Sequence, residues 1–135
     1  MIKKVGLAML VASALGIGFP ALAQEKSSGI PVMADELKKM VEPSLLISGR
    51  VVQAQEWFSQ LFQRGGIAHF IYTNDQGGGG HAQRTWRLDR DAFCVNDALL
   101  GERCYHFYRL ADGSFEGRSV PEEQLRYTFR VINPK

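Results

Sequence analysis

The clearest structural signal in this chain is the run RCYHFYRLADGSFEGRS, which extends from Arg103 to Ser119. Its first eight residues place alternate side chains on two faces, as a β-strand does. The Asp112-Gly113 pair then supplies the residues of a tight hairpin turn, and a short return strand follows. The run therefore predicts an antiparallel hairpin.

The same period of two recurs on both sides of this hairpin. It predicts strands over residues 45–52, 67–73, 84–88, 93–95 and 126–131, separated by turns rich in Gly and Asp. Short strands at regular spacing are typical of an antiparallel meander that curls or closes into a small barrel. We therefore expect a mainly β fold, a small antiparallel meander or barrel.

One short helix is expected before the strands, from Met33 to Val41. Acidic residues stand early in this segment and lysines late, as the helix dipole favours, and Pro43 ends it. A second, single helical turn is expected over Pro121–Gln124, where a proline opens the segment and acids follow.

The segment Glu56–Phe62 fits two structures. Its large apolar side chains match one face of a helix, but the turn at Arg64-Gly65-Gly66 and the strand beyond it favour a hairpin arm. We interpret the segment as a strand and keep the helix as the alternative.

The first 23 residues have the pattern of an export signal. Lys3 and Lys4 precede an apolar run from Val5 to Phe19, and Ala21-Leu22-Ala23 gives the small-x-small pattern of a cleavage site. We expect cleavage after Ala23 and a periplasmic or secreted protein, without a stable membrane span after cleavage; an uncleaved anchor is the alternative. The chain then divides into a signal peptide (1–23), a flexible mature N-terminus (24–32) and one β-rich domain (33–135).

The charge balance argues against nucleic acid as a partner. Two of the 16 Lys and Arg residues lie in the signal, against none of the 14 Asp and Glu residues, so the cleaved chain is neutral. Nucleic acids and anionic membranes select basic surfaces. We expect another exported protein or a small ligand as the partner instead.

Cys94 and Cys104 are the two cysteines of the chain. In an exported protein, such a pair at short spacing is most simply one disulfide. It closes a loop of about 11 residues, which the chain-entropy model values at roughly 2.5–3 kcal/mol. Nine intervening residues argue against a redox-active pair, and two thiolates alone argue against a metal site.

The order of these features resembles that of small exported Gram-negative proteins of unknown function with a lipocalin-like or half-barrel antiparallel fold. The features lie between Asp35 and Gly117: the helix opening Asp35-Glu36-Leu37, the strand opening Leu46-x-x-Gly49, Trp86 with an acidic turn before Cys94, Cys104 at a strand start, and the Asp112-Gly113 turn. The chain departs from that pattern at Gln83-Arg84-Thr85, where a glycine is expected, and in its four-glycine loop. The resemblance implies a fold and no catalytic residue.

The histidines do not form a motif. His69, His81 and His106 lack the close spacing with which one strand or helix supplies two metal ligands, so ordinary strand histidines are the better interpretation. We predict no metal, no cofactor and no catalytic residue. A small enzyme that uses His69, His106 and Asp91 in a barrel mouth is the alternative.

The loops are the candidate binding elements, because a rigid barrel presents its loops to partners. The first is the glycine-rich loop, in which a strand and not a helix follows the glycines, unlike in a phosphate-binding loop. The second is Asn96–Glu102. The predicted binding residues of the first loop are Asn74, Asp75, Gly77, Gly78, Gly79, Gly80 and His81.

Together these features predict an exported, non-catalytic binding domain, either an inhibitor, an accessory factor or a carrier of a small ligand. Besides the enzyme, one further alternative is an envelope or host-surface interaction protein. It rests on the aromatic cluster Trp57-Phe58 with Leu61-Phe62, for which burial in the core is the competing interpretation.

Overall fold

The computed structural model describes residues 25–54, 56–74 and 76–132. The expected signal peptide and its cleavage site lie outside these residues. The elements in chain order are β1 (Ile30–Pro31), α2 (Ala34–Met40), β2 (Ser44–Val51), β3 (Glu56–Gln63), β4 (Ile67–Thr73), β5 (Gly79–Asp89), β6 (Ala92–Asp97), β7 (Gly101–Arg109), β8 (Phe115–Ser119) and β9 (Leu125–Val131).

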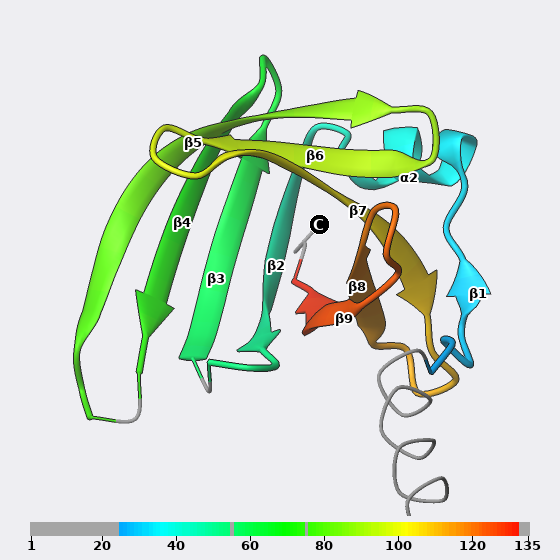
Figure 1. Ribbon diagram of the computed structural model, residues 1–135. Coiled ribbons are helices and arrows are strands. Elements are labelled where there is room, and N and C mark those ends of the chain that lie inside the picture. The colour runs from blue at the N-terminus through cyan, green and yellow to red at the C-terminus, as the bar shows by residue number, and fades with distance from the viewer. Residues whose placement is uncertain (1–24, 55, 75, 133–135) are drawn as a thin grey trace, which may run out of the picture.

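Strands β2 to β9 form a closed antiparallel barrel of eight strands. Each strand pairs with the next along the chain, and β9 returns to pair with β2, as Figure 1 shows at the red end of the ribbon. The expected mainly β fold, with one short helix before it, is therefore confirmed, and the meander closes. Closure leaves every barrel strand with two neighbours.

The seam between β2 and β9 depends on a glycine. Gly49 lies opposite Phe129, and a methyl group at residue 49 would lie 2.0 Å from the carbonyl oxygen of Thr128 and 2.6 Å from Phe129 Cα. Both of these atoms belong to the backbone, so a side chain could be fitted only by moving β9 away. Gly49 thus permits the close approach that completes the barrel.

Strand β1 extends one edge of β7. Ile30 pairs with Arg109 and Pro31 with Tyr108, beyond the part of β7 that β6 covers, and the Val32 N–H donates to the Phe107 carbonyl at 2.9 Å. The last residues of segment 24–32, expected to be a flexible N-terminus, are therefore paired with the barrel.

Helix α2 lies at one end of the barrel, beside the β5–β6 turn (Figure 1). The backbone N–H of Ala34 donates to Asp91 Oδ1 at 2.7 Å, which satisfies one of the free donors at the start of the helix. Leu37 points into the core and is fully buried, and Glu36 pairs with Arg109 at the end of β7. The helix therefore covers the barrel end at which β7 finishes.

A series of aromatic rings crosses the interior of the barrel. Phe62, Phe93, Phe107, Phe129 and Phe115 form a continuous series, in which consecutive ring centroids lie 4.5 to 5.3 Å apart. The rings come from five strands, so the series joins opposite walls of the barrel. Contacts between aromatic rings stabilise a fold by more than the burial of their apolar surface alone.

Of three local predictions, the structure confirms one, contradicts one and shortens one. Glu56–Gln63 is a strand, as interpreted; Phe58 and Phe62 point inward, whereas Trp57 points outward and is exposed. The helical turn expected over Pro121–Gln124 is wrong, because this segment is a non-helical turn in which Glu123 has a positive φ of 61°. The glycine-rich loop is shorter than expected, since Gly79, Gly80 and His81 already belong to β5.

Candidate functional site

A cavity of about 80 Å³ lies inside the barrel, toward the end away from helix α2. Its mouth is marked by Leu100 and Gly101, at the start of β7, whereas the other end of that strand contacts the helix. Its apolar wall consists of Ile47, Phe58, Phe62, Phe93, Val95, Phe107 and Phe129. Six polar side chains interrupt that wall: Gln60, Arg84, Asp97, Arg103, Tyr105 and Tyr127.

Gln60 is the most unusual of the six. It stands on β3 between the inward-facing Phe58 and Phe62, and only 6% of its surface is exposed. Its Oε1 atom is buried and has no hydrogen-bond partner among the described residues. A buried acceptor without a partner costs about 1–3 kcal/mol, so this side chain lowers the stability of the empty barrel.

Arg84 enters the cavity from β5. Its guanidinium carbon lies 4.1 Å from the centroid of the Phe70 ring, a cation–π arrangement. Its Nε lies 3.2 Å from Asp97 Oδ2, which is an ion-pair distance, but the geometry is not that of a hydrogen bond, and this Nε is buried without a hydrogen-bond partner among the described residues. Arg84 is thus neutralised but incompletely hydrogen-bonded.

Asp97 holds the β6–β7 loop and faces the arginines. Its Oδ1 accepts the backbone N–H groups of Leu99 at 2.8 Å and Leu100 at 3.2 Å. These two hydrogen bonds, followed by the nearby charges of Arg84 and Arg103, hold the pKa of the carboxyl below its usual range. Asp97 therefore stays ionised and fixes the rim of the mouth.

Tyr105 on β7 and Tyr127 on β9 line the cavity side by side. Their hydroxyl oxygens lie 3.0 Å apart, so one donates to the other and one hydroxyl hydrogen is left for another acceptor. Burial, followed by the effect of Tyr105, raises the pKa of Tyr127 far above its ordinary value. Tyr127 accordingly remains a neutral hydroxyl at physiological pH.

Arg103 lies at the mouth and is exposed to solvent. Within the described part of the chain its guanidinium makes no hydrogen bond and no ion pair within 4.0 Å, although its charge lowers the pKa values of Asp97 and Tyr127. Two arginines and one aspartate are therefore the charged side chains of the cavity wall, and the positive charge is in excess by one.

The predicted glycine-loop residues lie away from this cavity. Asn74 Oδ1 accepts the N–H groups of Gln76 and Gly78, so the side chain organises its own turn. His81 stands on the outer side of β5 with its ring stacked on His69 at 5.7 Å. None of the described residues of this loop lines the cavity, and Asp75 lies outside the described residues. Of the other predicted binding residues, Gly77 lies in the turn, and Gly79 and Gly80 belong to β5.

The second predicted loop does reach the cavity. Of the segment Asn96–Glu102, the residues Asp97, Leu100 and Gly101 line the mouth. Leu99 is 93% exposed beside them. Much of this segment is strand and not loop, because β6 ends at Asp97 and β7 begins at Gly101.

The residues of the enzyme alternative lie apart from one another. His69 is hydrogen-bonded to Gln63 Oε1 at 3.2 Å, His106 is paired with Glu123 at 2.6 Å, and Asp91 caps helix α2. None of the three lines the cavity. The structure therefore brings no two of them into one site.

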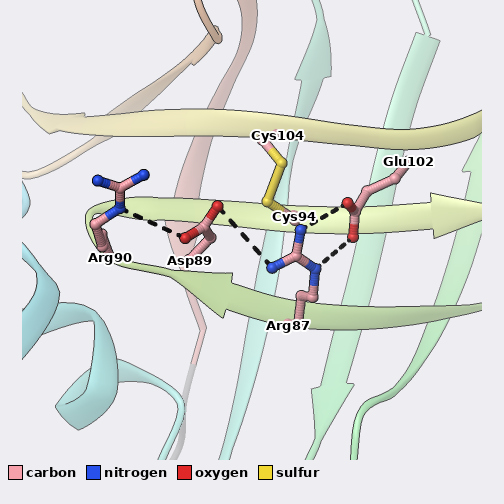
Figure 2. Close-up of a disulfide and its surroundings, with 6 residues drawn as sticks. All are labelled: Arg87, Asp89, Arg90, Cys94, Glu102 and Cys104. Carbon is pink, nitrogen blue, oxygen red and sulfur yellow. Dashed lines mark hydrogen bonds and ion pairs between the residues drawn. A yellow bond between two sulfur atoms is a disulfide. The ribbon is translucent and has the colours of Figure 1, made fainter.

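The expected disulfide is present on the outer face of the barrel, where Figure 2 shows its surroundings. Cys94 and Cys104 lie directly opposite each other on β6 and β7. Arg87 on β5 reaches across β6 and donates to both oxygens of Glu102 on β7, at 2.7 and 2.8 Å. Cys94, Glu102 and Cys104 are close enough to share a metal ion, but the two sulfur atoms are bonded to each other. This cluster is a cross-strand brace.

Of the six polar cavity residues, Asp97 lies in the second predicted loop, and the other five were not predicted from the sequence. A signal for some of them was available: Gln60 alternates with Phe58 and Phe62, and Arg84 has the parity of Trp86 and Leu88. A polar residue at an inward position of a strand is the exception in a core. Their convergence, in contrast, depends on strand pairings that the sequence alone does not specify.

No protein-family model matches the chain, and no curated protein or solved structure matches it either. The barrel and its disulfide agree with the fold implied by the resemblance to small exported proteins, and membership of that group stays a prediction. Among the described residues, no helix is long and apolar enough to cross a membrane. A disulfide is typical of oxidising compartments.

Proposed function

We propose that this protein is an exported binding domain that takes a small ligand into the barrel cavity. The observation that carries the proposal is Gln60, a nearly fully buried amide between two phenylalanines of the cavity wall, whose Oε1 has no hydrogen-bond partner among the described residues. Small-ligand sites are mostly apolar cavities with a few convergent polar groups, and this cavity has that composition.

The energetics support a role in binding over one in stability. A leucine at residue 60 would fill similar space without an unsatisfied acceptor, and the chain carries a glutamine instead. Arg84 has the same character, because its buried Nε makes no hydrogen bond to any described residue. Groups that cost stability in the empty protein are typical of sites that a ligand completes.

The frame supports the same proposal. The eight paired strands enclose the cavity, the disulfide joins two of these strands from outside, and the mouth lies at the short β6–β7 loop. A rigid barrel with one accessible end can bind a ligand without a large conformational change. Export to the periplasm or beyond, with cleavage after Ala23, belongs to the proposal and is compatible with the oxidised cysteines.

The test is a screen of small soluble compounds by ligand-observed NMR against the purified, oxidised protein. Val95→Phe adds a ring to the cavity wall and should abolish binding of any hit, whereas Asn96→Phe places the same ring on the outer face and should preserve it. Near-ultraviolet circular dichroism checks that both variants remain folded. Hits that bind Val95→Phe as well as the original protein would contradict the cavity as the site.

A second candidate, contact with another exported protein, is favoured by the loop tip. Leu99 and Leu100 are 93% and 60% exposed beside the mouth, an uncommon position for two consecutive leucines. Affinity capture from envelope and secreted fractions tests it. One stoichiometric protein, lost with the double variant Leu99→Ser/Leu100→Ser, would support the protein partner. No observation favours the enzyme alternative over these two.

A further inference from the structure

We propose, resting on the proposed function, that the ligand is a small organic monocarboxylate with a compact apolar body and a hydroxyl group. The carboxylate faces Arg103 and the tyrosine hydroxyls, the apolar body contacts the phenylalanine wall, and the ligand hydroxyl donates to Gln60. Each part of this description follows from one feature of the cavity.

The charge of the ligand follows from the charges of the wall. Asp97 lies 3.2 Å from Arg84 and so neutralises that arginine, which leaves Arg103 at the mouth as a cation without an ion-pair partner among the residues that the structure describes. A single negative charge completes the balance, whereas a neutral ligand leaves the excess and a cation increases it. Arginine also presents a planar fork of N–H donors that matches the two oxygens of a carboxylate.

The tyrosine pair supplies a further donor for an anion. One of the two hydroxyl hydrogens is used between Tyr105 and Tyr127, and the other has no acceptor among the described residues. Because Tyr127 is held in its neutral form, the pair offers a hydrogen to a ligand oxygen and not a second negative charge. This arrangement favours an acceptor-rich group such as a carboxylate.

The hydroxyl of the ligand follows from Gln60. Its Oε1 is an acceptor for which the described part of the chain supplies no donor, so the ligand atom beside it should carry hydrogen. The surrounding rings of Phe58 and Phe62 are apolar, so the rest of the ligand in this region should be hydrocarbon. The carboxylate and the hydroxyl therefore stand at separate positions on one compact molecule.

The size of the cavity limits the ligand. With 10–15 Å³ for each enclosed water, 80 Å³ holds about five to eight water-sized groups. A long acyl chain or a tetrapyrrole does not fit wholly inside such a volume. The ligand class is consequently a short hydroxy acid.

Four probes of similar size separate these requirements. Isovalerate tests the carboxylate, isovaleramide replaces its charge with a neutral amide, isopentylamine reverses the charge, and β-hydroxyisovalerate adds the hydroxyl. We expect isovalerate to bind at least tenfold more tightly than the amide, β-hydroxyisovalerate to bind more tightly still, and the amine to show no binding. Isothermal titration calorimetry and chemical-shift changes measure the affinities.

Matched variants assign the preferences to residues. Arg103→Gln should reduce the preference for isovalerate over isovaleramide to less than threefold, while Arg64→Gln makes the same change on the exposed β3–β4 turn and should leave the preference intact. Gln60→Leu should remove the gain from the hydroxyl group and leave the binding of isovalerate unchanged.

The outcomes separate the inference from the proposed function. Equal binding of acid and amide, or tighter binding of the amine, overturns the carboxylate assignment and leaves cavity binding in place. A gain from the hydroxyl that survives in Gln60→Leu overturns the role of Gln60. If none of the probes binds but other screened compounds do, the ligand class is wrong, and if no compound at all binds, the proposed function fails as well.

Discussion

Two arginines three residues apart on β5 show how differently the inside and the outside of this barrel are built. Arg87 faces outward and donates two hydrogen bonds to Glu102, at 2.7 and 2.8 Å (Figure 2). Arg84 faces inward, where its Nε lies near Asp97 but has no hydrogen-bond partner within the described ranges of the chain. The outer pair is complete by itself, whereas the inner group has unused hydrogen-bonding capacity in a place where such capacity is costly.

The comparison separates residues that hold the barrel together from residues that are available to a ligand. The outer cluster combines a disulfide, which joins the neighbouring strands β6 and β7, with an exposed ion pair, which joins β5 to β7 across β6. The inner cluster joins Gln60, Arg84 and the tyrosine pair around an open volume. Substitutions in the first region should therefore change stability, and substitutions in the second should change binding.

The largest effect is expected where β2 pairs with β9. Disruption of this pairing opens the barrel, so the outer contacts and the cavity are lost together. Gly49→Val places a branched side chain against the backbone of β9, which can be accommodated only if the two strands separate. We expect loss of the cooperative thermal transition and of the near-ultraviolet circular dichroism signal. A variant with a transition close to that of the original protein would contradict a tightly closed barrel.

The next largest effect is expected from the outer brace. Replacement of Cys94 and Cys104 together by serine removes a cross-link that closes a short loop, and the free energy of unfolding should fall by about 3 kcal/mol. Urea titration measures this loss. The affinity of the folded variant for a cavity ligand should change less than twofold, and a larger change would show that the two regions are coupled.

A smaller effect of the opposite sign is expected from the inner region. Gln60→Leu removes the unpartnered acceptor and keeps the volume nearly constant, so the free energy of unfolding should rise by about 1–2 kcal/mol. The same urea titration measures the gain. A loss of stability would mean that the amide makes a structural hydrogen bond. It would contradict the assignment of the inner polar residues to binding and not to stability.

The smallest effect concerns alkaline pH. Burial raises the pKa of Tyr127 in the folded barrel above its value of about 10 in the unfolded chain. The contribution of this tyrosine is fully present below the unfolded pKa and is lost as the pH rises toward the folded pKa, since only the unfolded chain then releases the proton. The decline in stability above about pH 10 should be shallower in Tyr127→Phe. Identical pH profiles for the two proteins would contradict the burial of this hydroxyl.

The sequence predicted most of the fold for a simple physical reason. Strands such as Ile67–Thr73 and the Asp112-Gly113 hairpin carry their signal in adjacent residues, through side-chain alternation and turn chemistry. The Cys94–Cys104 bridge was predictable because the chain has no other cysteine. Pro121–Gln124 was assigned wrongly, since a proline followed by acids suits both a helical turn and the irregular turn that forms.

The cavity could not be predicted in the same way. Gln60, Arg84 and Tyr127 are 24 and 43 residues apart in the chain, and they meet only because β9 returns to β2 and closes the barrel. Closure depends on Gly49, a position that looks like any strand glycine until its partner strand is known. The glycine-rich loop was predicted as a binding element from its unusual composition, but composition does not determine whether a loop lies beside a cavity.

The most direct test of the central claim is an NMR titration that follows the Nε–H signals of Arg84 and Arg87 and the side-chain amide of Gln60 during addition of β-hydroxyisovalerate. The account predicts that the signals of Arg84 and Gln60 move together with one dissociation constant, while the signal of Arg87 stays in place because its hydrogen bonds are already complete. Unchanged Arg84 and Gln60 signals at saturating probe, or an equal response from Arg87, would contradict it.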